Sequence, residues 1–452
     1  MNHAEAAAQF QTDRKRAQWH DRAVMHVRTR RDNAAKDVPE WEALRELAAA
    51  IKKHTLSNLA DYLEEFERRA TEHGIVVHWA EDGAAHNAIV HGLLAKHGVT
   101  RVVKSKSMLT EECGLNPYLE ERGIEIIDTD LGERIVQLRD ESPSHIVMPA
   151  IHLTRGDIGV LFHDRLGTPK GEQDPTRLTE AARRHLREKF LGGEAGITGV
   201  NFAVAETGEF VVCTNEGNAD LGTGLPKLHI ACMGIEKIVP RLADLGVFLR
   251  LLARSATGQA ITTYSSHYSK PRPGHEIHVV IVDDGRSRLL ADDHHRSALQ
   301  CIRCGACLNT CPVYRRSGGH SYGVTVAGPI GSVLAPMRDP ERHGSLPKAC
   351  SLCGSCSDVC PAKVDLHEQL LKWRAELAKH KPRTFERFAM EVTKEVLGSR
   401  FAYEKLTALA RFALRTLPRS LLERMVPAWA KERALPQAPR ESFRQRWERE
   451  RG

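Results

Sequence analysis

Eight of the eleven cysteines in this sequence fall into two short arrays with identical spacing. The arrays read CIRCGACLNTCP and CSLCGSCSDVCP, and their cysteines are Cys301, Cys304, Cys307 and Cys311, then Cys350, Cys353, Cys356 and Cys360. Both follow C-x2-C-x2-C-x3-C-P, in which a thiolate at every third residue can wrap three corners of an iron–sulfur cubane. Small residues such as Gly305 and Gly354 let the backbone approach the sulfides. The arrays therefore predict two [4Fe–4S] clusters.

The fourth cysteine of each array decides how the clusters are held. In two-cluster ferredoxins, the cysteine that precedes the proline binds the cluster of the other array. We therefore expect the first cluster at Cys301, Cys304, Cys307 and Cys360, and the second at Cys311, Cys350, Cys353 and Cys356. Structural zinc is the alternative, but paired zinc knuckles do not require three evenly spaced thiolates and a Cys-Pro, twice. Since such clusters carry one electron at a time, this region is predicted to conduct electrons.

The remaining composition is typical of a globular protein that stays in the cytoplasm. The chain has 452 residues, of which 41% are hydrophobic and 27% charged, so we expect two or three folded domains. Its first residues lack the apolar core of a secretory signal, and no run of 18 apolar residues predicts a membrane-spanning helix. The three other cysteines, Cys113, Cys213 and Cys232, are expected to be buried thiols.

Hydrophobic patterning divides the chain into four segments. Residues 1–70 have helical spacing and predict two helices. Residues 71–290 alternate short β-rich runs with helical stretches, which is typical of an α/β domain with a mostly parallel sheet. The cysteine arrays lie in 291–375, and the basic tail occupies 376–452.

Eight β-rich runs are the predicted strands of the α/β domain. They are GIVVHWA (74–80), TRVVKSKS (100–107), GIEIIDTD (123–130), HIVMPA (145–150), VNFAVAET (200–207), EFVVCT (209–214), KLHIACMG (227–234) and EIHVVIVDDG (276–285). Residues 234–258 read as one helix, or as two that are broken at Pro240.

The tail carries the positive charge of the whole chain. Residues 376–452 hold 18 Lys and Arg against 10 Asp and Glu, while the net charge of the chain is +7. Apolar residues such as Phe401, Leu409 and Phe412 recur at helical spacing, with interruptions at Pro418 and Pro427. Contact with the inner face of the membrane is one reading of this pattern, and a solvated helix packed on protein is the other. Nucleic-acid binding is not expected, because the charge is not spread over a folded face.

Two short stretches of the α/β domain could hold a ligand. KSKS (104–107) ends a predicted strand, at the edge where parallel sheets bind ligands. The turn TNEGN (214–218) could present backbone N–H groups to an anion, and Glu206 could act as an acid or base. An ordinary loop explains each stretch as well. The sequence holds no Gly-rich dinucleotide loop, P-loop or Ser-His-Asp signature.

Several segments together resemble the lactate utilization protein B family over nearly the whole chain. They are VVKSKSMLTEE (102–112), ITGVNFAVAETGEFVVCTNEGN (197–218), PKLHIACMGIEKIVP (226–240) and the double cysteine array. The resemblance implies an iron–sulfur subunit of a system that oxidises L-lactate to pyruvate for growth on lactate. It also implies two partners, a cysteine-rich CCG-domain subunit and a small subunit with a lactate-utilization domain.

The resemblance implies more about fold than about the substrate site. The α/β domain should be similar to the ribose-5-phosphate isomerase and glucosamine-6-phosphate deaminase group, and the cysteine region to the α-helical ferredoxin module of dehydrogenase subunits. If the isomerase-like fold retains a pocket, we expect it to be lined by Lys104, Lys106, Glu206, Asn215, Glu216, Gly217 and Asn218.

Two other functions stay open at this point. One is a sugar-phosphate or acyl-transfer enzyme on the α/β domain, with structural or sensory clusters. The other is an adaptor at the membrane surface that passes electrons to quinone. The resemblance implies part of an oxidoreductase of the L-lactate dehydrogenase type, but it identifies neither the electron acceptor nor the subunit that binds lactate.

Overall fold

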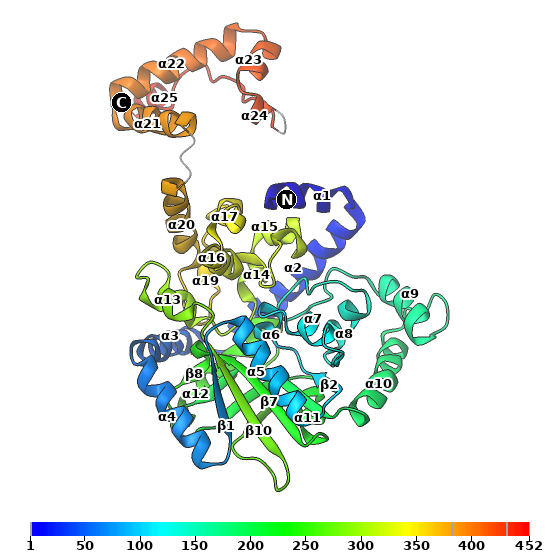
Figure 1. Ribbon diagram of the computed structural model, residues 1–452. Coiled ribbons are helices and arrows are strands. Elements are labelled where there is room, and N and C mark those ends of the chain that lie inside the picture. Colours follow the sequence, from blue (N-terminus) through cyan, green and yellow to red (C-terminus); the bar gives the residue numbers. More distant parts are fainter. Residues whose placement is uncertain (1, 381–383, 431–432, 452) are drawn as a thin grey trace. The chain divides into compact units, whose positions relative to one another are not determined.

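The computed structural model describes residues 2–380, 384–430 and 433–451. The chain forms two compact units, Met1–Leu377 and Ala378–Gly452 (Figure 1). The first unit holds both the sheet and the cysteine arrays. Among the described residues, no helix is long and apolar enough to cross a membrane.

A six-stranded sheet, parallel throughout, forms the centre of the first unit. Its order is β1 (Val76–Ala80), β10 (Glu276–Val282), β7 (Leu228–Gly234), β4 (Ala195–Gly199), β2 (Arg101–Lys104) and β3 (Glu125–Asp128). Strands buried on both faces read as continuous apolar runs, as the sequence EIHVVIV of β10 does. The predicted α/β class with a mostly parallel sheet is therefore confirmed.

Helices cover one face of this sheet, and a second sheet lies against the other. The first face packs against α5 (Gly83–Lys96), α6 (Met108–Glu112) and α7 (Leu115–Glu120). The second sheet has the order β8 (Ile238–Val239), β5 (Phe202–Val204), β6 (Phe210–Thr214) and β9 (Tyr264–Tyr268). At the β3 end of the large sheet lie α8 (Leu131–Leu138), α9 (Arg155–Leu166) and α10 (Pro175–Leu191), while α11 (Asn218–Gly224) packs against β4.

The amino-terminal segment has four helices rather than the two expected. They are α1 (His3–Thr12), α2 (Arg14–Lys36), α3 (Trp41–Ser57) and α4 (Leu59–Glu72). Asp13 ends α1 and caps α2, since its side chain accepts a hydrogen bond from the Arg16 amide. Polar capping residues divide a continuous helical pattern here, which periodicity alone did not reveal.

Two predictions for the α/β domain were wrong. HIVMPA (145–150) forms a loop, because the His145 ring accepts the Val147 and Met148 amides that a strand would use for pairing. Residues 234–258 contain a 3₁₀ turn at Ile235–Lys237 and strand β8 before a single helix, α12 (Leu242–Thr257). Pro240 thus separates a strand from a helix, not two helices.

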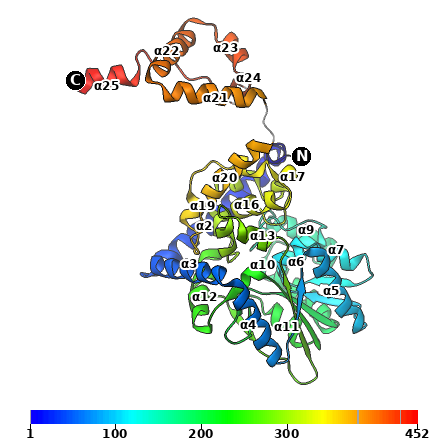
Figure 2. The ribbon, with the colours of Figure 1, turned by 60° about the vertical axis from the view of Figure 1, so that its left-hand side comes forward.

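Short helices build the cysteine region, which lies across one end of the sheet in both views (Figures 1 and 2). They are α13 (Arg286–Ala291), η2 (Arg296–Gln300), α14 (Ala306–Thr310), α15 (Pro312–Ser317), η3 (His320–Tyr322), α16 (Gly328–Arg338), α17 (Pro340–His343), α18 (Leu346–Ala349), α19 (Ser355–Asp358) and α20 (Leu366–His380). Cys307 and Leu308 share an apolar core with Phe210 and Ile281 of the two sheets. The cysteine region and the α/β part are therefore packed as one body.

The second unit is helical and has no buried interior among its described side chains. It contains α21 (Thr384–Gly398), α22 (Arg400–Thr416), α23 (Arg419–Met425), α24 (Pro427–Ala430) and α25 (Phe443–Arg451). The predicted interruptions at Pro418 and Pro427 are confirmed, because α22 ends before the first and α24 begins at the second. Large apolar side chains stay exposed, such as Phe401 at 71% and Phe412 at 64%.

Candidate functional site

The first cysteine group is buried. Cys304, Cys307 and Cys360 are buried and Cys301 is half-buried. All four line one small cavity whose other walls are apolar, with Ile302, Ile330 and Leu366 among them. The structure thus brings Cys360 of the second array to the first three cysteines of the first array.

The second cysteine group lies nearer the surface. Burial, together with the neighbouring Cys311, Cys350 and Cys353, raises the pKa of the Cys356 thiol to about 12. Cys311 of the first array therefore lies with the cysteines of the second. Cys353 is exposed, whereas Cys311 and Cys356 are buried. One group faces the interior of the protein and the other has an edge in solvent.

The two arrays have the same local backbone. Arg303 and Leu352, each just before the second cysteine of its array, have φ of 60° and 56°. Their amides lie 3.4 Å from the Cys301 sulfur and 3.2 Å from the Cys350 sulfur, and donate hydrogen bonds to them. Gly305 and Gly354 have φ of 77° and 78° and directly precede α14 and α19. Such backbone donors stabilise negative charge on sulfur.

These donor sets fit [4Fe–4S] clusters. Each group offers four thiols, and burial raises the pKa of Cys311 and Cys360 to about 11. Without metal these two thiols therefore stay protonated at neutral pH, and metal binding replaces their protons. Cys307 of the first group lies within electrostatic range of Cys356 of the second. The groups are thus neighbours, as an electron relay requires.

Cationic side chains surround the first group. Cys301 lies within electrostatic range of three cations, Lys52, Lys237 and Arg303. Cys304 lies within range of Arg31, and Cys360 lies within range of Arg45. The Arg45 Nε also donates a hydrogen bond to the Cys360 carbonyl at 3.0 Å. Positive charge around a cluster favours its reduced form. The first group is therefore set up to accept electrons.

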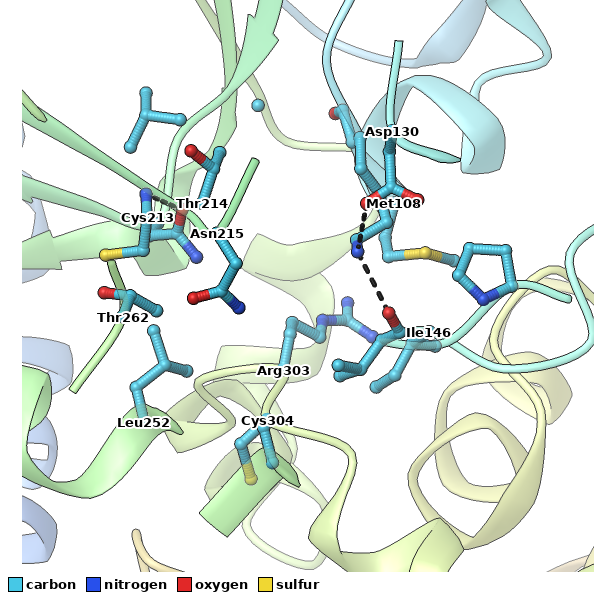
Figure 3. A pocket seen from close by; sticks show the side chains of 18 of the residues that line it. Met108, Asp130, Ile146, Cys213, Thr214, Asn215, Leu252, Thr262, Arg303 and Cys304 are labelled. Atoms are coloured by element: carbon cyan, nitrogen blue, oxygen red, sulfur yellow. Dashed lines mark hydrogen bonds and ion pairs between the residues drawn. The ribbon is translucent and has the colours of Figure 1, made fainter. Parts of the chain in front are cut away.

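A cavity of about 480 Å³ lies between the carboxyl edge of the large sheet and the first cysteine group. In Figure 3, Cys213 and Asn215 lie on one side, Met108 and Asp130 on the other, and Arg303 and Cys304 below. Segments that follow β2, β3, β4, β7 and β10 all contribute to its wall. This edge is where parallel sheets bind ligands.

Four of the seven residues that the sequence predicted for a pocket line this cavity. They are Lys106, Asn215, Glu216 and Asn218. Lys106 Nζ donates to Asp130 Oδ2 at 2.9 Å and to the Val147 carbonyl at 3.0 Å, so its charge is already paired. Burial and the charge of Asp130 raise the pKa of Glu216 to about 7.

The structure places the other three elsewhere. Lys104 is fully buried among Asp128, Glu111 and Glu133. Glu206 is exposed and accepts the Leu242 amide at 2.9 Å, where it caps α12. Gly217 precedes α11 with φ of 65°, and a side chain there would meet the Tyr264 ring.

We expect Lys104→Met to reduce the free energy of unfolding by about 3–5 kcal/mol, because it leaves buried carboxylates without their cation. Lys104 Nζ lies 2.7 Å from Asp128 Oδ1 and 2.9 Å from Glu111 Oε1. Denaturant unfolding under anaerobic conditions measures the loss. Lys106→Met is the control, and its loss should be about 1 kcal/mol, since Lys106 is partly exposed. Equal losses in the two variants would contradict this structural role of Lys104.

Sequence reasoning missed Lys237 and Arg303 as cavity residues. Lys237 follows β7 at the carboxyl edge, whereas the sequence pattern of residues 234–258 predicts a helix there. Arg303 lies between two cluster cysteines, whose spacing is the dominant signal of that segment. The signal that could have found Lys237 is its position directly after the apolar run KLHIACMG.

Comparisons with known proteins agree with this architecture. Residues 63–289 match the LUD domain model, and residues 297–364 match the 4Fe-4S dicluster domain model. The dicluster match and the clustered cysteines confirm the prediction of two [4Fe–4S] clusters.

Curated relatives cover most of the chain. Lactate utilization protein B of Shouchella clausii is 45% identical over 79% of this chain and 77% of its own, and that of an Exiguobacterium species is 41% identical over 95% and 93%. An uncharacterized electron transport protein of Escherichia coli, YkgF, is 45% identical over 79% of this chain and 76% of its own. The chain therefore belongs to the lactate utilization protein B family.

Proposed function

We propose that this chain is the iron–sulfur electron-transfer subunit of a complex that oxidises L-lactate to pyruvate. An electron-transfer role in lactate utilization follows from its family and its two clusters. The proposal adds the reaction and the place of this chain in it. Each [4Fe–4S] cluster, when bound, carries one electron at a time.

One observation carries the proposal: the first cysteine group borders the large cavity, and the second reaches the surface. Cys304 lines the cavity, whereas Cys353 is exposed. Cys307 and Cys356 bring the two groups into electrostatic range of each other. Electrons from a donor in the cavity would enter at the first group and leave at the exposed edge of the second.

The proposal includes the ligand assignment and the division of the chain. The first cluster takes Cys301, Cys304, Cys307 and Cys360, and the second takes Cys311, Cys350, Cys353 and Cys356. The functional segments are 1–70, 71–290, 291–375 and 376–452. We also propose that the α/β part is related to the ribose-5-phosphate isomerase and glucosamine-6-phosphate deaminase group, which supports a ligand at the carboxyl edge.

The partners are proposed to be a cysteine-rich CCG-domain subunit and a small subunit with a lactate-utilization domain. The test is anaerobic purification of this chain alone and together with both subunits, followed by addition of L-lactate. The chain alone should show little turnover, because two-electron oxidation of lactate needs a group that accepts a hydride or an electron pair. The complex should bleach the visible absorbance of its clusters. A complex that converts lactate without bleaching would contradict the proposal.

A second candidate role, contact with an anionic membrane surface, is favoured by the second unit. Its helices expose Phe401, Leu409 and Phe412 among basic side chains, and no described side chain there is buried. Exposed apolar side chains with Lys and Arg beside them are typical of helices that lie on anionic lipid. Such contact would bring the protein close to quinone.

Deletion of residues 381–452 should leave both clusters assembled but abolish sedimentation with vesicles that contain anionic phospholipid. The cut spares α20, whose Trp373 Nε1 donates to the Val333 carbonyl at 2.9 Å and helps to hold the cysteine region. Iron and sulfide analysis checks the clusters, and high salt should weaken vesicle binding of the full chain. Loss of iron on deletion would show instead that the tail belongs to the ferredoxin fold.

A further inference from the structure

Positive charge at the floor of the large cavity is only partly paired. Lys237 lines the cavity, and among the described residues its ammonium group makes no hydrogen bond or ion pair. Arg303 also lines it and makes one ion pair, from Nη2 to Glu112 Oε1 at 3.3 Å. Its Nη1 is buried without a hydrogen-bond partner in the described structure. The side chains of Lys237 and Arg303 thus border one cavity, and each has N–H donors that no described residue accepts.

The need to balance the charge of the first cluster does not by itself explain why Lys237 and Arg303 lie at the cavity. Three other cations, Lys52, Arg31 and Arg45, already lie near this cysteine group and do not line the cavity. Lys52 is fixed there, since its Nζ donates to the Ile238 carbonyl at 3.3 Å and to the Glu236 carbonyl. Lys237 and Arg303 differ from them in facing open space.

Neighbouring acids neutralise these two cations only in part, because each acid is shared with other arginines. Glu236 pairs with Arg286 at 2.7 Å, and Glu112 is shared by Arg286, Arg303 and Arg338. Across the cavity, Asp130 is occupied by Lys106. Because like charges repel in a dry site, an anion between Lys237 and Arg303 would stabilise both.

The other residues that line the cavity indicate the chemistry of the rest of the ligand. Met108, Ile146, Met148 and Leu252 give the cavity apolar surfaces that suit a short carbon chain. Asn201 uses its Oδ1 to accept the Cys213 amide at 2.8 Å, which leaves its amide N–H groups for a hydroxyl or carbonyl oxygen. A carboxylate is planar and has two oxygens, so it can accept hydrogen bonds from the guanidinium group of Arg303 and pair with the ammonium group of Lys237 at the same time.

We propose that this cavity binds a small organic acid, with Lys237 and Arg303 holding its carboxylate beside the first cysteine group. This inference rests on the proposed function, because it identifies the substrate class and its place on this chain. It assigns the anion to Lys237 and Arg303 and not to Lys104 or Lys106, whose charges are already paired.

The test uses anaerobically purified protein with both clusters loaded and no partner subunit. Calorimetric titration with L-lactate should give saturable binding, as should pyruvate and acetate, with inorganic phosphate as the comparison anion. Lys237→Met should raise the Kd for L-lactate about tenfold or more, the effect of losing a charged hydrogen bond. Lys52→Met is the matched control, since Lys52 is near the same cysteines but outside the cavity, and its Kd should stay within about twofold.

Spectroscopy of the reduced protein adds a second readout. L-lactate should change the electron paramagnetic resonance signal of the first cluster but not that of the second, and Lys237→Met should remove this change. If Lys237→Met loses iron, Lys237→Gln replaces it, because a shorter polar side chain still ends at the cavity.

Three results would overturn the inference. They are no saturable carboxylate binding to the loaded wild type, equal Kd changes in Lys237→Met and Lys52→Met, and tighter binding of phosphate than of any carboxylate. Failure here is distinguishable from failure of the proposed function, since binding is measured without partners. If L-lactate bleaches the clusters of the complex but does not bind to this chain, only the binding-site inference is contradicted. If L-lactate binds but the clusters of the complex are not bleached, only the proposed function is contradicted.

Discussion

Serine at Cys304 or at Cys353 should abolish reduction of the assembled complex by L-lactate. Cys304 lies where the first group meets the cavity, and Cys353 lies where the second group meets solvent. Each substitution should therefore interrupt the electron path at one end. Stopped-flow absorbance of the anaerobic complex measures the rate, which should fall to background in both variants.

Cys113→Ser is the matched control for both cysteine variants. Cys113 is a half-buried thiol that belongs to neither cluster group, and burial raises its pKa to about 12, so it stays protonated. Its variant should transfer electrons at the wild-type rate. Circular dichroism should show that all three variants keep the α/β fold. Full lactate-dependent activity in a variant that lacks both clusters would discard the electron-transfer hypothesis, because the clusters would then be structural.

The sequence predicted the carboxyl edge of the sheet as a ligand site, but it could not tell which side chains reach the cavity. Lys104 is the last residue of β2 and is buried among acidic side chains, while Lys106, two residues later, lies in the cavity wall. Alternation along a strand holds only while the strand continues, and β2 ends at Lys104. The turn that follows determines where Lys106 lies, and that turn depends on Asp130 and the loop at Val147.

Groupings that follow from a recognised spacing pattern could be predicted, and contacts that depend only on how the chain packs could not. The two four-cysteine groups were predicted from the cysteine spacing together with the exchanged fourth cysteine of two-cluster ferredoxins, and Cys360 lines one cavity with Cys301, Cys304 and Cys307. Lys237 and Arg303 are 66 positions apart and lie near each other only because the end of β7 and the start of the first array border the same cavity. The basic tail was recognised from its composition, but its lack of buried side chains is a structural observation.

Each array is expected to give its fourth cysteine, the one that precedes a proline, to the cluster of the other array. Replacing these two cysteines should therefore affect opposite clusters. Wild-type protein, purified anaerobically, should contain about eight iron and eight sulfide per chain. Cys311→Ser should perturb the cluster held by Cys350, Cys353 and Cys356, and Cys360→Ser should perturb the other. In each variant the cluster that does not lose a ligand should keep its resonance signal.

Local structure should survive these substitutions, which keeps the comparison informative. The Cys311 sulfur accepts the Tyr314 amide at 3.4 Å at the start of α15, and the Cys360 sulfur accepts the Val364 amide at 3.3 Å. A serine hydroxyl can accept the same bonds and is a good helix cap, so what is lost is mainly the thiolate ligand. Iron analysis with electron paramagnetic resonance of both reduced variants decides the assignment. Loss of the Cys301, Cys304 and Cys307 signal in Cys311→Ser would reverse it and show that each array holds its own cluster.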